Sequence, residues 1–381
     1  MWKRFAEYLW CPFCQNKLAL IPIEEYKVRL EAKDYITGEH FGIQPDRLNE
    51  YIETGALLCS NCKHWYPILY GLPVILPYET PIVHEFLQKH GSSLIKEYAF
   101  PKEMPKPGEH FVLKSFSKEW LEYNYDGVIW GWSYEDREKT FLTEMGFNGG
   151  EIKGVRFLEI GCGLGITTNF AQKKYNADAV GVDLSLAVLK ATNYYKKNPF
   201  LHFVQATLFQ LPFKKNQFDL LYSHGALHHT YSTKKAVKAI LPYCKPGGWA
   251  YIWVYGKGGQ INSWDRKLGH YGETFLRPML SRLPSSVATI LLAPIALGYM
   301  LLNSILRRRN PTLQPYNFKR ALHAARDRFT PLFAFRQSYE EVESWFTEAG
   351  FKNIQRVDWH TVPPAVHALF RGAVGVRGQR K

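Results

Sequence analysis

The sequence lacks the features expected of an exported or repetitive protein. Its 381 residues include only six cysteines. The first residues, MWKRFAEYLWCPFC, contain no long apolar core followed by small side chains, so they predict no secretory signal peptide. No internal repeat or low-complexity tract is evident. Without such a signal, paired cysteines favour a metal site over disulfides, and we expect a cytoplasmic location.

Acidic residues are also scarce, with 34 against 48 basic ones and a formal net charge of +14. The deficit is concentrated between Lys257 and Arg336, where 13 basic and three acidic residues give a net charge of +10. Such a balance favours an anionic partner, either nucleic acid or an acidic membrane surface.

Charge is wholly absent from Leu283 to Leu306, within the stretch PSSVATILLAPIALGYMLLNSILRRR. About 20 apolar residues suffice to cross a bilayer. Pro294 and Gly298 permit a kink or a short helical hairpin that enters a membrane and returns. Arginine lies at both borders of the stretch, so the charge pattern does not define an inside.

Four of the cysteines form two pairs, Cys11-Pro-Phe-Cys14 and Cys59-Ser-Asn-Cys62. Each pair can form a tight turn whose thiolates bind one Zn²⁺, and two turns complete a tetrahedron. The alternative is a set of buried or redox-active cysteines. A helix near Asp46–Thr54 would account for the 44 residues between the pairs, a long spacing for a ribbon. Four thiolates leave no open position on the metal, so we expect a folding and docking unit over residues 1–78.

The second cysteine pair continues as CSNCKHWYPILYGLPVILP. This stretch resembles the small zinc-ribbon partner proteins of RNA and protein methyltransferases, and the resemblance covers residues 8–77. More loosely, it is similar to rRNA guanine methyltransferases, which carry an N-terminal zinc ribbon on the same chain. The resemblance implies that the ribbon binds zinc. Binding of a protein partner by the ribbon stays an open alternative. Residues 79–135 are expected to hold a linker, including FPKEMPKPGEH, and aromatic-rich helices that cover a cofactor.

A glycine-rich turn follows in RFLEIGCGLG, residues 156–165. Phe157–Ile160 reads as a buried strand, and a helix is expected near Ile166–Tyr175. Ala179–Val182 predicts a second strand ending at Asp183, where an acid reaches ribose hydroxyls in a Rossmann-like site. Both NAD(P) and S-adenosylmethionine fit this pattern. Glu159 disfavours a pyrophosphate, because like charges repel, and suits a cationic amino acid moiety.

The segments EIGCGLG, GVDLS, QLPFKKNQFDLLYSHGALHHT and CKPGGWAYIWVY together resemble class I S-adenosylmethionine-dependent methyltransferases of the type 11 group. The resemblance covers residues 140–256 and, more loosely, 338–375. It implies an α/β fold, with a Rossmann-like seven-stranded sheet, helices on both faces and a methyltransferase domain at 136–256 and 337–381. The implied cofactor-binding residues are Glu159, Gly161, Cys162, Gly163, Gly165, Asp183, Leu184, Thr207, Leu208, Ser223 and His224.

The resemblance also implies roles for these residues. Glu159, Gly161 and Gly163 would hold the methionine end of the cofactor. Asp183 would bind the ribose diol, with Leu184 against the adenine.

The sequence departs from the family pattern at the third strand. Where the family often has Gly-Asp, this chain has Ala206-Thr207, and Thr207 carries no charge to meet the adenine amino group. Ser223 and His224 would line the far wall. Cys162 is expected to pack between the glycines.

Methyl transfer requires alignment of the nucleophile with the methyl group and, where needed, removal of a proton. His228 and His229 are candidate bases, with packing or helix capping as the alternative for one of them. His323 and Asp327, in ALHAARDRFTP, are second candidates because they fall in the variable segment that builds the acceptor pocket in such enzymes. Their alternative is a surface helix face.

The end of the chain returns to the sheet. SYEEVESWFTEAG, from Ser338 to Gly350, predicts a helix with a capping box. Ile354–Trp359 and Ala368–Val376 are expected to be the last two strands. Residues 257–336 therefore form a basic, apolar helical insertion. One membrane crossing inside the insertion would separate these strands from the sheet.

Three interpretations of the apolar stretch remain: a monotopic contact with anionic head groups, a helical cap over an apolar acceptor pocket, or a plain core or oligomer helix.

These observations lead to three alternative hypotheses for the function of the protein. The first is transfer of a methyl group to a small or lipid-linked hydrophobic acceptor, with a peripheral contact to the cytoplasmic face of a membrane. The second is tRNA or rRNA methylation, which zinc and basic charge favour. The apolar run and the lack of an Asn/Asp-Pro-Pro-Tyr motif count against it. The third is a non-catalytic zinc-ribbon binding module, which the intact cofactor motifs disfavour.

Overall fold

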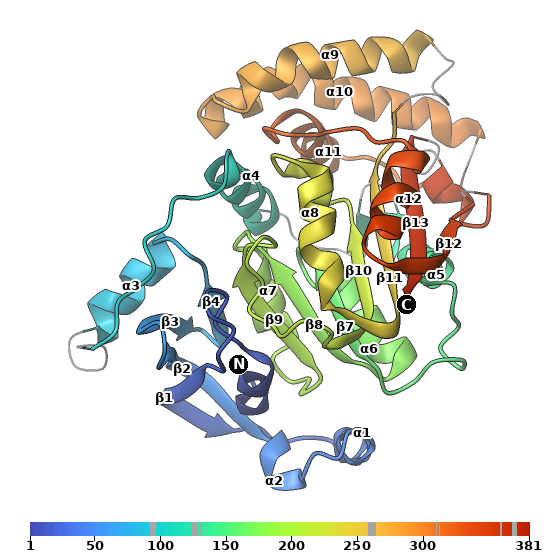
Figure 1. The fold of residues 1–381 in the computed structure, drawn as a ribbon. Helices are drawn as coiled ribbons and strands as arrows, with labels where there is room; N and C mark the ends of the chain where they lie inside the picture. The colour runs from blue at the N-terminus through green and yellow to red at the C-terminus, as the bar shows by residue number, and fades with distance from the viewer. Residues whose placement is uncertain are drawn as a thin grey trace.

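The computed structural model describes residues 1–381 except 92–96, 123–127, 130–131, 258–263, 310, 312, 359 and 368–371. Its central element is a mixed sheet of 11 strands (Figure 1). The strand order is β1-β2-β3-β4-β9-β8-β7-β10-β11-β13-β12. A separate two-stranded ribbon joins β5 (Val128–Ile129) to β6 (Trp132–Ser133).

Seven strands of this sheet form the predicted α/β core. Their bounds, in sheet order, are β9 Leu201–Ala206, β8 Asp178–Asp183, β7 Arg156–Ile160, β10 Phe218–His224, β11 Cys244–Tyr255, β13 Ala373–Arg380 and β12 Phe351–Arg356. The first five are parallel, and β13 runs antiparallel to both of its neighbours. The parallel strands are buried along most of their length, which is why they read as continuous apolar runs. The predicted fold class is confirmed.

The last two strands begin at different residues from those predicted. The sixth strand lies earlier, at Phe351–Arg356, and the seventh later, at Ala373–Arg380. Pairing with β11 sets the seventh strand, in a register that runs from Trp249 opposite Gln379 to Tyr255 opposite Ala373. The predicted ends at Trp359 and at 368–371 lie outside the described residues.

Helices cover both faces of this core (Figure 1). α8 (Thr233–Ile240) and α12 (Tyr339–Glu348) pack together on one face, and α5 (Tyr134–Met145) and α6 (Ile166–Tyr175) pack on the other. α7 (Ala187–Tyr194) packs on β8 and β9. The predicted capping box of α12 is present between Ser338 and Glu341. Short 3₁₀ turns occur at Leu227–His229, Leu241–Tyr243 and Pro364–Val366.

The N-terminal ribbon, residues 1–78, continues the same sheet. Its strands are β1 Ala19–Lys27, β2 Glu50–Cys59, β3 His64–Leu69 and β4 Leu72–Ile75. They are antiparallel to one another, but β4 pairs in parallel with β9, with Val74 opposite Gln205 and Ile75 opposite Ala206. The ribbon therefore shares backbone hydrogen bonding with the core at the strand that ends at the predicted adenine position.

The predicted helix near Asp46–Thr54 is wrong beyond Leu48. The segment between the cysteine pairs holds α1 (Ala32–His40) and the one-turn α2 (Pro45–Leu48), and β2 begins at Glu50. Tyr51 and Ile52 are fully buried and pair with β1. Aromatic and β-branched side chains favour a half-buried strand over a helix, and pairing with β1 decides the outcome.

A buried ion pair also joins the ribbon to the core. Arg4, in the 3₁₀ helix η1 (Lys3–Tyr8), donates to both carboxylate oxygens of Asp178 on β8 at 2.8 and 2.6 Å. His202 and Tyr8 bind the same carboxylate. Burial opposes ionisation of Asp178, yet Arg4 holds its pKa well below the usual range.

The expected linker is partly helical. α3 (Pro81–His90) follows the ribbon, and α4 (Glu109–Glu122) packs on α7 and α11. The insertion, residues 257–336, then forms α9 (Trp264–Leu280), α10 (Ser285–Arg309) and α11 (Phe318–Phe329). Figure 1 shows these three helices as a layer above the sheet.

Of the kink and the short hairpin that Pro294 and Gly298 permit, the hairpin does not form, because α10 is one helix of 25 residues that continues through Pro294. Its narrow buried face, including Leu292 and Ala296, packs along α11 and explains the continuity. Leu280, Leu292, Ala325 and Phe329 form a small core separate from the main one. Among the described residues, this helix is long and apolar enough to cross a membrane, and only 11% of its most apolar window is buried.

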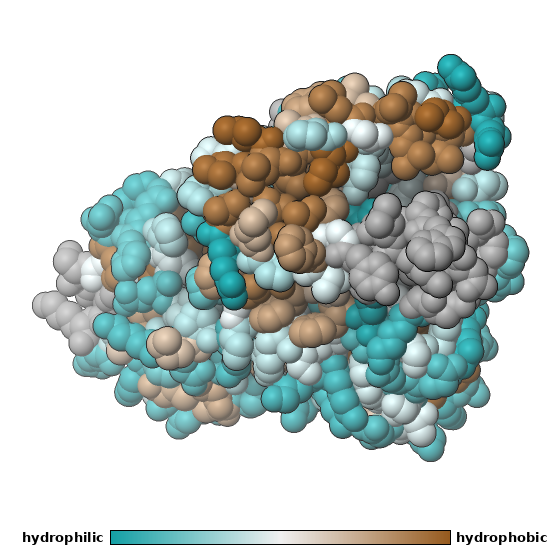
Figure 2. Space-filling view, turned by 90° about the horizontal axis from the view of Figure 1, so that it is seen from above, coloured by the Kyte–Doolittle hydropathy of each residue, from teal (hydrophilic) through white to brown (hydrophobic). Residues whose placement is uncertain are grey.

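The opposite face of the insertion is exposed and apolar. Figure 2 looks onto it and shows hydrophobic side chains gathered over α9 and α10. The exposed residues are Phe275, Met279, Val287, Ile290, Leu291, Leu297, Leu301, Leu302, Ile305 and Leu306. Arg307, Arg308 and Arg309 follow at the end of α10.

Candidate functional site

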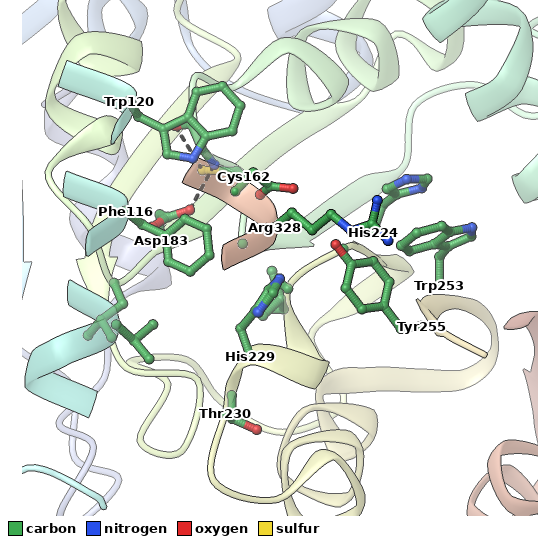
Figure 3. A pocket seen from close by; sticks show the side chains of 18 of the residues that line it. Phe116, Trp120, Cys162, Asp183, His224, His229, Thr230, Trp253, Tyr255 and Arg328 are labelled. Carbon is green, nitrogen blue, oxygen red and sulfur yellow. Dashed lines mark hydrogen bonds between the residues drawn. The ribbon is translucent and has the colours of Figure 1, made fainter. Parts of the chain in front are cut away.

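A cavity of about 680 Å³ lies at the carboxyl ends of β7, β8, β9 and β10. α4, α10 and α11 close it from the other side, contributing Phe116 and Trp120, Tyr299 and Leu302, and Arg328. Figure 3 shows Arg328 in the middle of the view, with Trp120, Cys162 and Asp183 on one side and Trp253 and Tyr255 on the other. Ligands in open α/β sheets bind at this edge.

Most of the predicted cofactor residues line this cavity. They are Glu159, Gly161, Cys162, Gly163, Asp183, Leu184, Thr207, Leu208 and His224. Two others do not reach it. Gly165 begins α6 with a φ of +72°, and Phe203 leaves no room for a Cβ there. Ser223 is fully buried and donates to the carbonyl oxygen of Ile160 at 3.0 Å, so it joins two strands.

The glycine turn and Asp183 form one unit. Gly161 and Gly163 have φ angles of +76° and +52°, which side chains with a Cβ rarely adopt. A Cβ on Gly161 would lie 2.2 Å from the Cβ of Ala226. The amide of Gly163 donates to Asp183 Oδ2 at 2.8 Å, which holds that carboxylate at the end of β8. The backbone and the acid thus face the cavity in a fixed arrangement.

A carboxyl group and a guanidinium, those of Glu159 and Arg137, lie at the same wall of the cavity. Glu159 is buried and accepts a hydrogen bond from Thr168, and burial raises its pKa to about 8. Arg137, on α5, lines the cavity and donates from Nη2 to Thr167 at 3.3 Å. Its buried Nε and Nη1 have no hydrogen-bond partner among the described residues. The same guanidinium lies over the Trp132 ring, 5.5 Å from its centroid. Burial of its other two nitrogens without hydrogen-bond partners is costly, so this wall suits a ligand that carries both an ammonium and a carboxylate.

Sequence reasoning missed Arg137 and Glu109. Glu109, at the start of α4, is buried in the cavity wall and accepts a hydrogen bond from Thr207. It therefore places a carboxylate beside the strand end where the sequence has threonine in place of the family's acid. Burial raises the pKa of Glu109. One signal in the sequence could have indicated Glu109. Thr207 stands where the family often has an acid, so another segment had to supply the carboxylate.

The two adjacent histidines have different surroundings. His229 lines the cavity, and its Nδ1 donates to the carbonyl oxygen of Phe333 at 2.7 Å. A carbonyl can only accept, so Nε2 carries the lone pair, and burial lowers the pKa of His229 to about 4. His228 lies outside the cavity, stacked on Tyr255 at 3.9 Å. Its ring nitrogens lack hydrogen-bond partners among the described residues. The geometry favours His229 as a base.

His224 has a partner that the sequence did not reveal. Its Nδ1 lies 2.8 Å from the carboxylate of Glu144, which is completely buried on α5. Tyr222 and Tyr251 donate to the same carboxylate. The His224 ring stacks on Trp253 at 4.5 Å, and burial lowers its pKa. Glu144 thereby fixes the orientation of a cavity-lining histidine, an arrangement typical of positioned imidazoles.

Of the other candidate pair, only Asp327 reaches the cavity. His323 packs edge-on against Trp120 at 5.2 Å, with its Nε2 3.5 Å from a carboxylate oxygen of Glu119. Burial raises the pKa of both Glu119 and Asp327, and the repulsion from Asp327 adds to the shift at Glu119. The alternative of a surface helix face does not describe His323, which is buried.

The four paired cysteines converge on one point. The ligand atoms of Cys11, Cys14, Cys59 and Cys62 all lie within 4.8 Å of one another. The Sγ atoms of Cys14 and Cys59 are 3.4 Å apart, and those of Cys11 and Cys62 are 4.0 Å apart. Gln15 and Lys63, each directly after a pair, both have a φ of +56°. Two equivalent turns thus present four thiol groups, the donor set of a closed structural zinc site.

Comparisons with known proteins agree with both halves of this description. Residues 158–252 match the methyltransferase domain family, and residues 3–69 match the Trm112p-like protein family. An uncharacterized protein of Synechococcus sp. is 26% identical over 44% of this chain and 37% of its own length. Sterol 24-C-methyltransferase erg6 of Aspergillus fumigatus is 30% identical over 27% of this chain and 29% of its own length.

The chain therefore spans about a third of the length of the curated relatives that it matches. A solved structure of Haemonchus contortus phosphoethanolamine N-methyltransferase 2, 16% identical, superposes with a TM-score of 0.44 over 73% of this chain and 61% of that one. The two matched segments cover the glycine turn with the parallel strands, and the cysteine pairs with the ribbon. The chain contains a methyltransferase domain and, N-terminal to it, a Trm112p-like domain.

Proposed function

We propose that the chain is an S-adenosylmethionine-dependent methyltransferase. The observation that carries this proposal is the set of charged groups on one side of the cavity. Glu159 and Arg137 would bind the ammonium and carboxylate of the methionine end. Asp183 would bind the ribose hydroxyls, and Glu109 would accept from the adenine amino group. The two Arg137 nitrogens that lack hydrogen-bond partners among the described residues, and the place of Gly161 and Gly163 in the cavity lining, support the fit.

When bound, S-adenosylmethionine supplies an electrophilic methyl group on a sulfonium. The chain's own contribution is alignment and exclusion of water, which α4 and the insertion provide by covering the cavity. The Nε2 atom of His229 would take a proton from the methyl acceptor, since Nδ1 already donates a hydrogen bond to the carbonyl oxygen of Phe333. Its low pKa keeps the imidazole neutral and able to accept at pH 7.

The acceptor is proposed to be hydrophobic, small or lipid-linked. Tyr299, Leu302, Leu306 and Leu313 line the cavity on the insertion side, so α10 contributes both to the cavity and to the exposed apolar face. The sterol methyltransferase among the relatives acts, by its name, on a hydrophobic acceptor. An RNA acceptor would meet an apolar surface instead of a continuous basic one.

A peripheral membrane contact is part of this proposal. The apolar face of α9 and α10 would enter the head-group region, and Arg307, Arg308 and Arg309 would contact anionic lipids. The remaining interpretations, a cap over the pocket or a plain core helix, each describe one face of α10. Tyr299 lines the cavity and Leu292 is buried in the small core, whereas Ile290 is 72% exposed.

Calorimetric titration with S-adenosylmethionine tests the activity proposal. We expect binding by the full chain, and a loss of about tenfold or more in affinity for both Arg137→Met and Glu109→Gln, because each removes a charged hydrogen bond. Lys352→Met, an exposed change on β12, serves as the control for loss of charge. A folded chain that does not bind S-adenosylmethionine would refute the proposal.

A further inference from the structure

Three arginines surround one carboxylate on the insertion side of the cavity. Glu273, on α9, is 2% exposed. Arg336 and Arg277 donate to its Oε2 at 3.0 and 3.3 Å, and Arg328 donates to its Oε1. Since one carboxylate balances only one guanidinium, the cluster carries two positive charges in excess.

The excess charge faces the cavity. Arg328 and Arg336 both line it, and their side chains are 39% and 20% exposed. Arg277 lies behind them, 12% exposed, and donates to the carbonyl oxygen of Arg328 at 2.8 Å. Figure 3 shows Arg328 extending from α11 between the two walls of the cavity. Nη1 of Arg328 also donates to the hydroxyl of Tyr299 at 3.2 Å, and Nη1 of Arg336 donates to the carbonyl oxygen of Gly256 at 3.4 Å. The two lining guanidinium groups therefore hold their positive charge at this side of the cavity.

Nearby acids do not neutralise the cluster. Asp327 also lines the cavity, but it forms no ion pair with an arginine within the part of the chain that the structure describes. Burial, opposed by Arg277, raises the pKa of Asp327 and favours its uncharged form. Burial also lowers the pKa of Arg277, despite the attraction of Glu273. Grouping several cations around one anion is costly unless a further anion joins them.

We propose that Arg328 and Arg336 bind an anionic head group of the methyl acceptor, a phosphate or a carboxylate. Planar guanidinium groups bind such oxoanions through paired hydrogen bonds. The apolar body of the acceptor would then follow Leu302, Leu306 and Leu313 along α10 toward its exposed face. This inference rests on the proposed function, and it narrows the acceptor from a hydrophobic molecule to an anionic amphiphile.

Binding of three single-chain probes tests the inference. Dodecyl phosphate and dodecanoate, each below its micellar concentration, and dodecanol, below its solubility limit, are titrated into the full chain with S-adenosylhomocysteine present. We expect at least one anionic probe to bind about tenfold or more tighter than dodecanol, as a charged hydrogen bond provides. The stronger of the two anionic probes identifies the head group.

Variants distinguish binding of the anionic head group by the arginines from a purely structural role of the same side chains. Arg336→Met and Arg328→Met should each remove the preference for the anionic probe while dodecanol binding persists. Glu273→Gln should preserve or increase the preference, because it removes the competing carboxylate. Lys352→Met should leave it unchanged. Equal affinity for the three probes, or parallel loss of all three in the arginine variants and in Glu273→Gln, would overturn the inference.

The same preparations are titrated with S-adenosylmethionine. Cofactor binding without an anion preference overturns this inference alone. Absence of cofactor binding overturns the proposed function, and with it the assignment of the probe site to a methyl acceptor.

Discussion

The N-terminal ribbon and the insertion are both additions to the seven-stranded core, yet they attach in opposite ways. The ribbon extends the sheet through the pairing of β4 with β9, and it buries the Arg4–Asp178 ion pair against β8. Within its described residues, the insertion adds no strand to the sheet and has a small core of its own. It leaves many large apolar side chains exposed, such as Ile290 and Leu301.

The two modes of attachment indicate different contributions of the ribbon and the insertion to the protein. Because the ribbon shares backbone pairing and a buried ion pair with the core, we expect it to unfold together with the core. A separate small core allows the insertion to vary without disturbing the sheet, so it can carry acceptor specificity and the proposed membrane contact. The cavity lies between the core and the insertion. Among the described residues the ribbon contributes none to its lining, and the ribbon's nearest link to it is the pairing of β4 with β9, the strand that precedes the lining residue Thr207.

Loss of zinc should have the largest effect and would test the attachment of the ribbon. Metal binding and folding are coupled in small thiolate sites, where binding is worth about 10 kcal/mol or more. We expect Cys59→Ser to lower solubility and the melting temperature of the whole chain in a single transition. We also expect it to weaken S-adenosylmethionine binding, because β4 pairs with β9, which ends at Ala206 directly before Thr207. A separate, early transition that leaves cofactor affinity intact would show that the ribbon folds independently.

Breaking the ion pair between ribbon and core should come next. Arg4→Met leaves the buried carboxylate of Asp178 without its main partner, which typically costs about 3–5 kcal/mol. Urea unfolding measures the loss. The matched change in the insertion is Arg326→Met, which breaks a partly exposed pair with Glu122 at 2.6 Å and should cost at most about 1 kcal/mol. Similar losses of unfolding free energy in the two variants would contradict the proposed difference in attachment between the ribbon and the insertion.

The cavity itself should give a smaller, pH-dependent effect. The pKa of Glu159 is about 8 in the ligand-free protein, above its ordinary value, so the folded state holds a proton there that the unfolded chain has lost. Stability from this group therefore declines as pH rises toward 8, whereas binding of a cationic ligand strengthens because the carboxylate becomes charged. Affinity for S-adenosylmethionine should rise between pH 6.5 and 8.5, with at most about a tenfold gain per pH unit. Glu159→Gln should abolish this rise, and a flat wild-type profile would contradict it.

Polar substitution on the exposed face of α10 should have the smallest effect on stability. Ile290→Ser, Leu297→Ser and Leu301→Ser together should change the free energy of unfolding by about 0.5 kcal/mol per site or less, as exposed sites do. They should nonetheless abolish sedimentation with anionic liposomes, which the wild-type chain should show in a salt-sensitive manner. Ile36→Ser, an equally exposed site on the ribbon's α1, should leave sedimentation unchanged. Sedimentation that survives the triple change would remove the membrane contact.

The sequence predicted the parallel core and the glycine turn well, because buried strands and positive-φ glycines leave local signatures such as Phe157–Ile160 and Gly161. It also grouped the cysteines correctly as one cluster. It did not reveal the joining of β4 to β9 or the pair of Arg4 with Asp178, because neither depends on local pattern. Glu109 and Arg137 were missed for the same reason, since they reach the cavity from helices distant in sequence.

The proposed reaction is methyl transfer to an acceptor that enters beneath the insertion. It is tested most directly by incubating the full chain with S-adenosylmethionine labelled in its methyl group and a cell lysate, then separating lipids, RNA and water-soluble small molecules. We predict label in the lipid extract, with less label for both Arg328→Met and Arg137→Met. Label found only in RNA, or no transfer by a chain that binds the cofactor, would contradict it.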